Sequence, residues 1–412
     1  MTTQDVRSST SAGTGRPPRL VGAVWALLIV NTLGSQGADT IIPIPRTVTQ
    51  MITMGAVALA FVVALLLNPR LLVRPSAYLL ILTALAAVAV AASMPLESGL
   101  GGLFRCARLI GFVATLWLIS RWWDGSLAFV RYHVRVLMVV VASVVIGLLV
   151  SPGHALPEYY DGRLVGAIWP LTAPQVGQYA AVLAGLVLIL WLSKLTPGSV
   201  AAFVAIPSIG VLLLTHTRTA AFGLVAGLTV ALLSSLLTNP RARRVFTVGA
   251  ITGGVALVVF LPVLQAWVLR GQDEDDFGTL TGRAKVWDAL LAEPRTLYQE
   301  LFGTGLSNKS FGGLPIDNSW LAAYHEQGLI GASLVALFLI TLLVVAVTRP
   351  PSPQRACALF LVAYCLVASY TEAGLADASP YLLHLAVAAA LLVPQASRPG
   401  TARTASKTGG AS

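Results

Sequence analysis

The chain has 412 residues, of which 56% are hydrophobic and only 11% are charged, whereas about 25% of the residues in soluble domains are charged. This composition excludes an ordinary soluble globular domain and is typical of a protein whose surface faces lipid. The formal net charge of +10 could indicate a nucleic-acid-binding protein. The placement of the basic residues, given below, explains the charge without a nucleic-acid partner.

Apolar segments long enough to cross a bilayer recur through the sequence. A hydrocarbon core about 30 Å thick requires about 20 mainly apolar residues per helix, and a helix satisfies its own backbone polar groups. We therefore predict an all-α integral membrane protein with about 12 transmembrane helices and one large extracytoplasmic helical loop. The predicted spans are residues 20–36, 48–68, 75–93, 100–120, 132–150, 174–193, 199–215, 219–238, 245–268, 328–348, 356–371 and 379–395.

These spans divide the chain into five regions. Residues 1–19 and 396–412, rich in small and polar residues, are predicted to be disordered cytoplasmic tails, and the first span to be an uncleaved signal anchor. Residues 20–268 hold helices 1–9, residues 269–327 form the large extracytoplasmic loop, and residues 328–395 hold helices 10–12. In the loop, apolar residues recur at helical spacing over residues 282–293, which predicts an amphipathic helix lying against the membrane surface.

The charges of the connectors fix an expected orientation. With both termini in the cytoplasm, the inner connectors and tails carry 17 of the 27 basic residues and only two acids, Asp5 and Asp124, which is a charge of +15. The outer connectors then carry ten basic and fifteen acidic residues, which is a charge of −5. Because positively charged connectors stay inside, the sequence predicts a multi-pass protein of the cytoplasmic membrane with its chemically capable residues outside.

The sequence contains two groups of possible metal ligands. Cys106, Cys357 and Cys365 lie inside predicted spans and are spaced neither as metal ligands nor as a disulfide framework, so we assign them packing roles. The acidic run at residues 273–276 offers the oxygen ligands that divalent cations prefer, but its spacing matches no metal motif, and such runs in loops are usually solvated. No metal site is predicted.

Arginines near the outer ends of the spans are candidate anion ligands. Arg105 and Arg108 lie one turn apart in the fourth span, where two guanidinium groups can hold a phosphate or a diphosphate. The alternative is that they pair with Glu97 or extend to the interface. Arg163 and Arg283 add two further outward cations. Several arginines on one face of a membrane favour a lipid-linked anionic substrate.

Arg218 lies at the tip of a tight hairpin between the seventh and eighth spans. Backbone N–H groups at a helix start, a Thr217 cap and an arginine make an anion site there. The alternative is a capped turn with a solvated arginine. His325, close to the start of the tenth span, is either a base or a structural hydrogen-bonding partner.

Residues 317–331 resemble the signature of the O-antigen ligase and O-antigen polymerase superfamily, in which a His-Asn pair precedes a Gly-x-x-Gly by nine residues. Here the pair is Asp317-Asn318, and the glycines are Gly328 and Gly331. Three other stretches are similar to family landmarks in the expected order: Gly162-Arg163-Leu164 with Pro170, Thr217-Arg218-Thr219-Ala220, and Gly282-Arg283 through Trp287 to Gly303-Thr304-Gly305-Leu306. The resemblance covers residues 161–331.

The resemblance implies a GT-C-type, metal-independent glycosyltransferase without a cofactor. Such an enzyme moves a glycan from a polyprenyl diphosphate carrier to a glycan, lipid or wall-polymer acceptor outside the cytoplasmic membrane. The catalytic histidine of the family corresponds to Asp317, and an aspartate can also deprotonate an attacking sugar hydroxyl. We therefore expect an inverting transfer with Asp317 as base and His325 in reserve. Arg218 and Arg283 are expected to neutralise the diphosphate, with Arg105, Arg108 and Arg163 as second choices.

Two other functions are compatible with the sequence. A lipid-linked oligosaccharide flippase or other transporter would place polar groups along a path through the midplane, whereas the predicted spans are almost free of acids. A cell-wall elongation glycosyltransferase that uses a monosaccharide-phosphate carrier would need to bind only one phosphate. The sequence names neither the sugar nor the acceptor.

Overall fold

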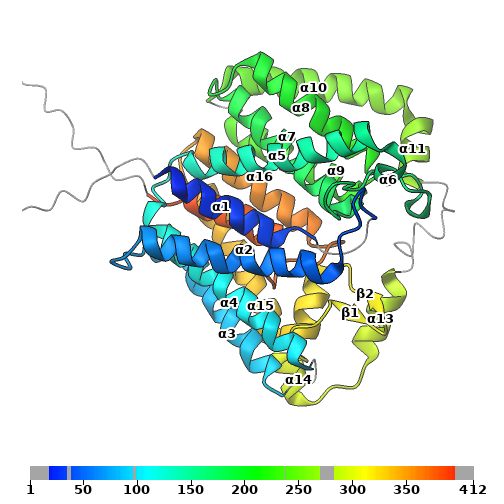
Figure 1. Cartoon of the computed structure of the whole chain (residues 1–412). Coiled ribbons are helices and arrows are strands. Elements are labelled where there is room, and N and C mark those ends of the chain that lie inside the picture. The colour runs from blue at the N-terminus through cyan, green and yellow to red at the C-terminus, as the bar shows by residue number, and fades with distance from the viewer. Residues whose placement is uncertain (1–17, 35–38, 96–98, 237, 270–282, 395–412) are drawn as a thin grey trace, which may run out of the picture.

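The computed structural model describes residues 18–34, 39–95, 99–236, 238–269 and 283–394. It is 74% helical and nearly all-α (Figure 1). In the described part of the chain, six helices are long and apolar enough to cross a membrane, and five shorter helices are also apolar. The predicted helical class is therefore confirmed, whereas the predicted count of about 12 transmembrane helices is not. The predicted tails lie mostly outside the described residues, and Glu97 and the acidic run at residues 273–276 lie outside them entirely.

The elements follow one another in chain order as a series of helices with one short hairpin. They are α1 (Arg19–Thr32), α2 (Arg46–Leu67), α3 (Ala77–Ser93), α4 (Gly99–Ile119), the 3₁₀ turn η1 (Ser120–Trp122), α5 (Ala128–Val150), α6 (Pro152–Ala155), η2 (Glu158–Tyr160), α7 (Ala173–Leu192), α8 (Gly198–Leu214), α9 (Arg218–Ser235), α10 (Pro240–Val259), α11 (Leu261–Leu269), α13 (Arg283–Ala292), α14 (Leu297–Phe302), β1 (Ser310–Phe311), β2 (Leu314–Pro315), α15 (Ser319–Thr348), α16 (Pro353–Ala368) and α17 (Pro380–Leu391).

The core of the bundle is built around α7, α16 and α17. Every residue of α17 and nearly every residue of α7 is buried, as expected for helices that are apolar on all sides. Glycines allow close approach, because a Cβ at Gly185 of α7 or at Gly227 of α9 would overlap the Phe360 ring of α16. Small residues at helix interfaces are typical of membrane bundles.

The outer helices bury only a narrow stripe. In α2, α5 and α9, 28% of the most apolar 18-residue window is buried, compared with 83% in α7. Their outward surfaces carry large apolar side chains, among them Leu66, Leu149 and Phe222. An apolar surface of this extent is unstable in water but is what contact with lipid requires.

Each predicted span overlaps a helix, but two of these helices depart from the prediction, the first of them in its continuity. The sequence predicts the ninth span as one helix over residues 245–268, but α10 ends at Val259 and α11 begins at Leu261. Pro262 explains the break, because proline has no N–H to donate to the Val258 carbonyl and its ring collides with that group. Phe260 adopts a non-helical backbone conformation between the two helices.

The tenth span also begins earlier than predicted. Helix α15 starts at Ser319, nine residues before the expected start at residue 328, and Gly328 interrupts it with a φ of 66°. A Cβ on Gly328 would lie 2.3 Å from the backbone carbonyl of Leu301 in α14. The glycine therefore permits both the left-handed conformation and the contact between α14 and α15.

We predict that Gly328→Ala destabilises the protein by about 2–5 kcal/mol, since it adds left-handed strain to a backbone clash. Thermal unfolding of the detergent-solubilised protein measures this loss. Gly312→Ala is the matched control, because Gly312 also has a positive φ, of 57°, but a Cβ on it would have no atom within 4 Å. Equal losses in the two variants would show that conformational strain, and not the contact with α14, is responsible.

The segment before α15 combines two short helices with a hairpin. Helix α13 confirms the helix predicted over residues 282–293 within the described part of that range. Strands β1 and β2 pair antiparallel across Gly312 and Gly313, both of which have positive φ. Two consecutive left-handed residues form the tight turn that joins hairpin strands. This hairpin is not among the predicted elements, although a Gly-Gly pair between two short strands is a known hairpin signal.

The connectors meet in two separate groups. In the first group, which we call the basic end, arginine side chains donate to carbonyls at helix ends: Arg74 to Trp123, Arg241 to Trp191 and Arg349 to Leu392. In the second group, which we call the site end, residues 151–172 contact residues 215–217, and residues 283–319 contact residues 369–379. Arg163 of the first pair lies within electrostatic range of Arg283 and Glu372 of the second. The two groups match the sets of connectors that charge separates in the sequence.

Candidate functional site

An ion pair between Arg283 and Asp317 lies at the centre of the candidate site. Both Nε and Nη2 of Arg283 lie 3.1 Å from Oδ2 of Asp317. The Arg283 side chain is 28% exposed and the Asp317 side chain 33% exposed, so the pair is accessible from outside the protein. Arg283 is the first residue of α13, and Asp317 lies two residues before α15.

The backbone around Asp317 is held on both sides. The Ile316 N–H donates to the Lys309 carbonyl across the hairpin segment, and the Ser319 N–H donates to the Ser369 carbonyl. Asn318 caps α15, since its Oδ1 accepts from the backbone N–H groups of Trp320 and Leu321 at 2.9 and 3.0 Å. Asp317 is therefore not the helix cap, and its carboxylate is left for Arg283 and the exterior.

Arg163 and Arg218 converge on the same place from two other segments. Both arginines lie within electrostatic range of Arg283. Arg163 follows η2, and its Nε donates to the Thr215 carbonyl at 3.0 Å. Arg218 begins α9. We call Arg163, Arg218, Arg283 and Asp317 the Arg283 cluster.

Thr217 does not act as the predicted side-chain cap of α9. Its hydroxyl donates to the Ala173 carbonyl at 3.2 Å and accepts a long, 3.5 Å hydrogen bond from Nη2 of Arg163. The hydroxyl thus joins the start of α7 to the loop that carries Arg163. Because the hydroxyl is directed to α7, it does not cap the N–H groups in the first turn of α9.

Burial and charge oppose each other at Asp317. Burial raises the pKa of Asp317 above its ordinary value of 3.8, while the neighbouring Arg283 lowers it, and burial has the larger effect. Burial also lowers the pKa of Arg163. The positive charge of Arg283 lowers this pKa further, and the negative charge of Glu372 raises it. Glu372 and Asp161 act on Arg163 as well, so the cluster is not purely cationic, but its three guanidinium groups can donate parallel hydrogen bonds to a multiply charged anion. A carboxylate of raised pKa beside them suits proton removal.

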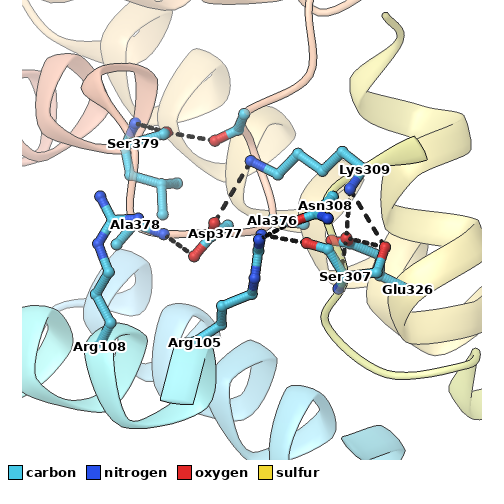
Figure 2. A network of polar contacts seen from close by, with 12 residues as sticks. Arg105, Arg108, Ser307, Asn308, Lys309, Glu326, Ala376, Asp377, Ala378 and Ser379 are labelled. Carbon is cyan, nitrogen blue, oxygen red and sulfur yellow. Dashed lines mark hydrogen bonds and ion pairs between the residues drawn. The ribbon is translucent and has the colours of Figure 1, made fainter. Parts of the chain in front are cut away.

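Arg105 and Arg108 contribute to a different cluster (Figure 2). Arg105 donates through Nη1 to the Ser307 carbonyl and through Nη2 to Oδ1 of Asn308. Arg108 donates to the Asn31 carbonyl at 2.5 Å. Both arginines lie within electrostatic range of Asp377. The two arginines, predicted as ligands of a phosphate or diphosphate, therefore donate to groups of the protein itself and lie near Asp377.

Asp377 lies in the α16–α17 connector, and its buried carboxylate faces Lys309 of the hairpin segment. Lys309 Nζ lies 3.5 Å from its Oδ2, and Oδ1 accepts from the Ala378 N–H at 2.6 Å. Burial raises the pKa of Asp377, but Lys309, Arg108 and Arg105 together lower it further, so the net shift is downward. A buried carboxylate is stable only when it is paired in this way.

Glu326 completes this second cluster. Its Oε1 accepts from the backbone N–H and the hydroxyl of Ser307 at 2.8 and 2.9 Å, and from the Lys309 N–H at 3.2 Å. These bonds attach residues 307–309 to α15 (Figure 2). The cluster therefore fixes the segment that leads into Asp317, and its two carboxylates are paired with groups of the protein itself.

His325 lies on α15 and is held by Arg295. Nη2 of Arg295 lies 3.0 Å from Nδ1 of His325, and the Arg295 guanidinium also lies over the Tyr324 ring. The His325 carbonyl accepts from the N–H and the hydroxyl of Thr304. Since Nδ1 accepts from an arginine, the ring proton resides on Nε2. These contacts favour the structural interpretation of His325.

Sequence reasoning missed the connector at residues 369–379. Its Glu372 acts electrostatically on Arg163, its Asp377 pairs with Lys309, and the Thr371 hydroxyl contacts that of Thr219 at 2.5 Å. The sequence feature that could have pointed to this connector is the presence of two acidic residues, Glu372 and Asp377, between two apolar segments that contain few charges. Lys309, Arg295 and Glu326 were also missed. The three cysteines are buried free thiols, in agreement with packing roles.

The comparisons with known proteins do not add to this picture. No protein-family model matches the chain, and no curated protein matches it either.

Proposed function

We propose that this protein is a membrane glycosyltransferase of the O-antigen ligase and polymerase type. It transfers a glycan from a polyprenyl diphosphate carrier to an acceptor, at the end of the helix bundle that holds the Arg283 cluster. Asp317 is the general base, and Arg163, Arg218 and Arg283 hold the diphosphate.

One observation carries the proposal. The residues singled out by the resemblance come from four segments separated by tens of positions, centred on Arg163, Arg218, Arg283 and Asp317. In the structure Arg283 pairs with Asp317 and lies within electrostatic range of the other two arginines. Nothing local in the sequence brings these segments together, so their meeting supports the interpretation of the ordered motifs as one site.

The chemistry follows from the charges. Asp317 accepts the proton of the attacking acceptor hydroxyl while the bond between the sugar and the diphosphate breaks. The diphosphate leaves with increasing negative charge, and preorganised guanidinium groups in a partly dehydrated site stabilise this charge without reorganisation. The attack from the opposite face of the sugar inverts the configuration of the anomeric carbon.

We propose that the twelve spans of the sequence correspond to α1–α5, α7–α9, the broken pair α10 and α11, and α15–α17. The basic end then faces the cytoplasm and the site end faces outward. Reporter fusions after residue 300 and after Ser412 should give opposite localisation signals. Equal signals would contradict the proposed topology, and inverted signals would place the Arg283 cluster in the cytoplasm.

The ion pair predicts a pH dependence of the transfer rate. A base acts in its deprotonated form, so kcat/KM should rise with pH through the pKa of Asp317 and then level off. Arg283 lowers the pKa of Asp317, so Arg283→Gln should raise that pKa. The rise of kcat/KM on the acidic side of the pH profile, which we call the acid limb, should then occur at higher pH. Lys285→Gln, which removes an exposed lysine of the same helix, should leave the limb in place. An unmoved limb in Arg283→Gln would exclude Asp317 as the group that titrates.

A transfer assay with the purified full-length protein tests the proposed function. The expected result is release of polyprenyl diphosphate as a carrier-linked glycan is joined to an added acceptor. Deletion in cells distinguishes the two subclasses: single repeat units accumulate on the carrier if the enzyme is a polymerase, and long unattached chains accumulate if it is a ligase. Movement of the intact donor across vesicles without release of diphosphate would instead identify a flippase and overturn the proposal.

A further inference from the structure

A pocket of about 310 Å³ opens at the basic end and shares no lining residue with the Arg283 cluster. The start of α16, the end of α17 and the α15–α16 connector enclose it. Its polar lining comes from Arg349, Ser352, Gln354 and Arg355, and none of the described residues that line it is acidic. The pocket is therefore a cavity with two uncompensated cations in its wall.

The two arginines are fixed by carbonyls that also line or adjoin the pocket. Arg349 donates to the Leu392 carbonyl at 2.5 Å, and Arg355 donates to the Arg349 carbonyl at 2.8 Å. These bonds hold the guanidinium groups in place but leave their charge unneutralised. Nε of Arg355 is buried and has no hydrogen-bond partner among the described residues. Because this nitrogen is buried, a ligand in the pocket meets the other nitrogens of the two half-buried guanidinium groups.

The start of α16 adds to the positive character. Ser352 caps this 16-residue helix by accepting from the Arg355 N–H at 3.2 Å. Helix N-termini carry partial positive charge and bind anions. The end of α17 would oppose this effect, but its Leu392 carbonyl is already bonded to Arg349.

We propose that this pocket binds a phosphate group, separately from the Arg283 cluster. Arginine is the preferred side chain for phosphate because its planar guanidinium donates two parallel hydrogen bonds. The phosphate is that of an anionic phospholipid headgroup or a free phosphate ion, since both present the same oxygens. A headgroup suits the location, because basic pockets between helix ends attract anionic lipids.

Native mass spectrometry of the full-length protein in detergent tests the headgroup source, with phosphatidylglycerol and phosphatidylcholine as probes. The wild type should retain phosphatidylglycerol more strongly than phosphatidylcholine. Gln354→Glu places a carboxylate in the pocket wall without removing either arginine, and should weaken phosphatidylglycerol binding about 10- to 100-fold. Arg355→Gln, which removes one of the two guanidinium groups, should also weaken phosphatidylglycerol binding.

Arg70→Gln is the matched control, because Arg70 is an exposed arginine at the same end and does not line the pocket. It should bind phosphatidylglycerol as the wild type does. Calorimetry with inorganic phosphate provides the second arm: heat that disappears in Gln354→Glu, with no preference between the two lipids, identifies a free phosphate site. Unchanged binding of both probes in Gln354→Glu and Arg355→Gln would overturn the proposal, as would a wild type that binds neither.

Discussion

Asp317→Asn should lower the rate of glycan transfer by about 10²–10⁴-fold, the usual contribution of a general base. Asparagine has nearly the shape of aspartate but cannot accept the proton of the acceptor hydroxyl. The protein should still fold, because Asn318 and not Asp317 caps α15, and a partly exposed ion pair is worth only about 0–1 kcal/mol. Initial rates of transfer by the purified variant, with its melting temperature, measure both effects.

Asp288→Asn is the matched control for this variant, because it removes an exposed carboxylate from α13 of the same outer segment. It should transfer glycan at the wild-type rate. Asp317→His should recover part of the activity if the position of the base, and not the carboxylate itself, is what the chain shares with the family that it resembles. A nearly normal rate in Asp317→Asn, together with an inactive His325→Ala, would show that His325 is the base.

Arg218→Gln should lower kcat/KM by about 10²–10³-fold, the cost of removing one preorganised donor from a developing anion. Arg218 begins α9 and lies within electrostatic range of Arg283. A cation on the diphosphate acts in the ground state and in the transition state, so KM should rise as kcat falls. Asp317→Asn should instead reduce kcat with little change in KM, and this contrast separates the two roles.

Lys285→Gln is the control for charge alone, since Lys285 is an exposed cation two residues from Arg283. It should leave both kinetic constants unchanged. An equal loss of activity in Lys285→Gln and Arg218→Gln would indicate general electrostatic attraction of the donor. Unchanged kinetics in Arg218→Gln would remove this arginine from the proposed site.

The sequence by itself determined the helical class and the positions of the helices. An apolar segment of about 20 residues is a local feature, and its hydrogen bonds are local too, so the long apolar helices could be predicted without knowledge of their neighbours. The division of connectors into a basic set and an acidic set was also readable, because charge counts need no coordinates. The errors of continuity arose where one residue, Pro262 or Gly328, changes the backbone inside an apolar run.

Only the tertiary structure decided which polar residues belong together. The sequence assigned Arg283 as a first choice and Arg105, Arg108 and Arg163 as second choices for one diphosphate site. The fold instead places Arg105 and Arg108 near Asp377, and Arg163 within electrostatic range of Arg283, which pairs with Asp317. That choice depends on contacts between segments more than 100 residues apart, such as Arg105 with Ser307.

The same reason explains the residues that were missed. The connector at residues 369–379 has no motif of its own, and it gains its role because α16 and α17 bring Glu372 and Asp377 to the site end. A local pattern reports the periodicity and charge of one segment. The neighbours that shift the pKa of Asp317, or that neutralise Asp377, are set by the packing of distant helices, which no local pattern records.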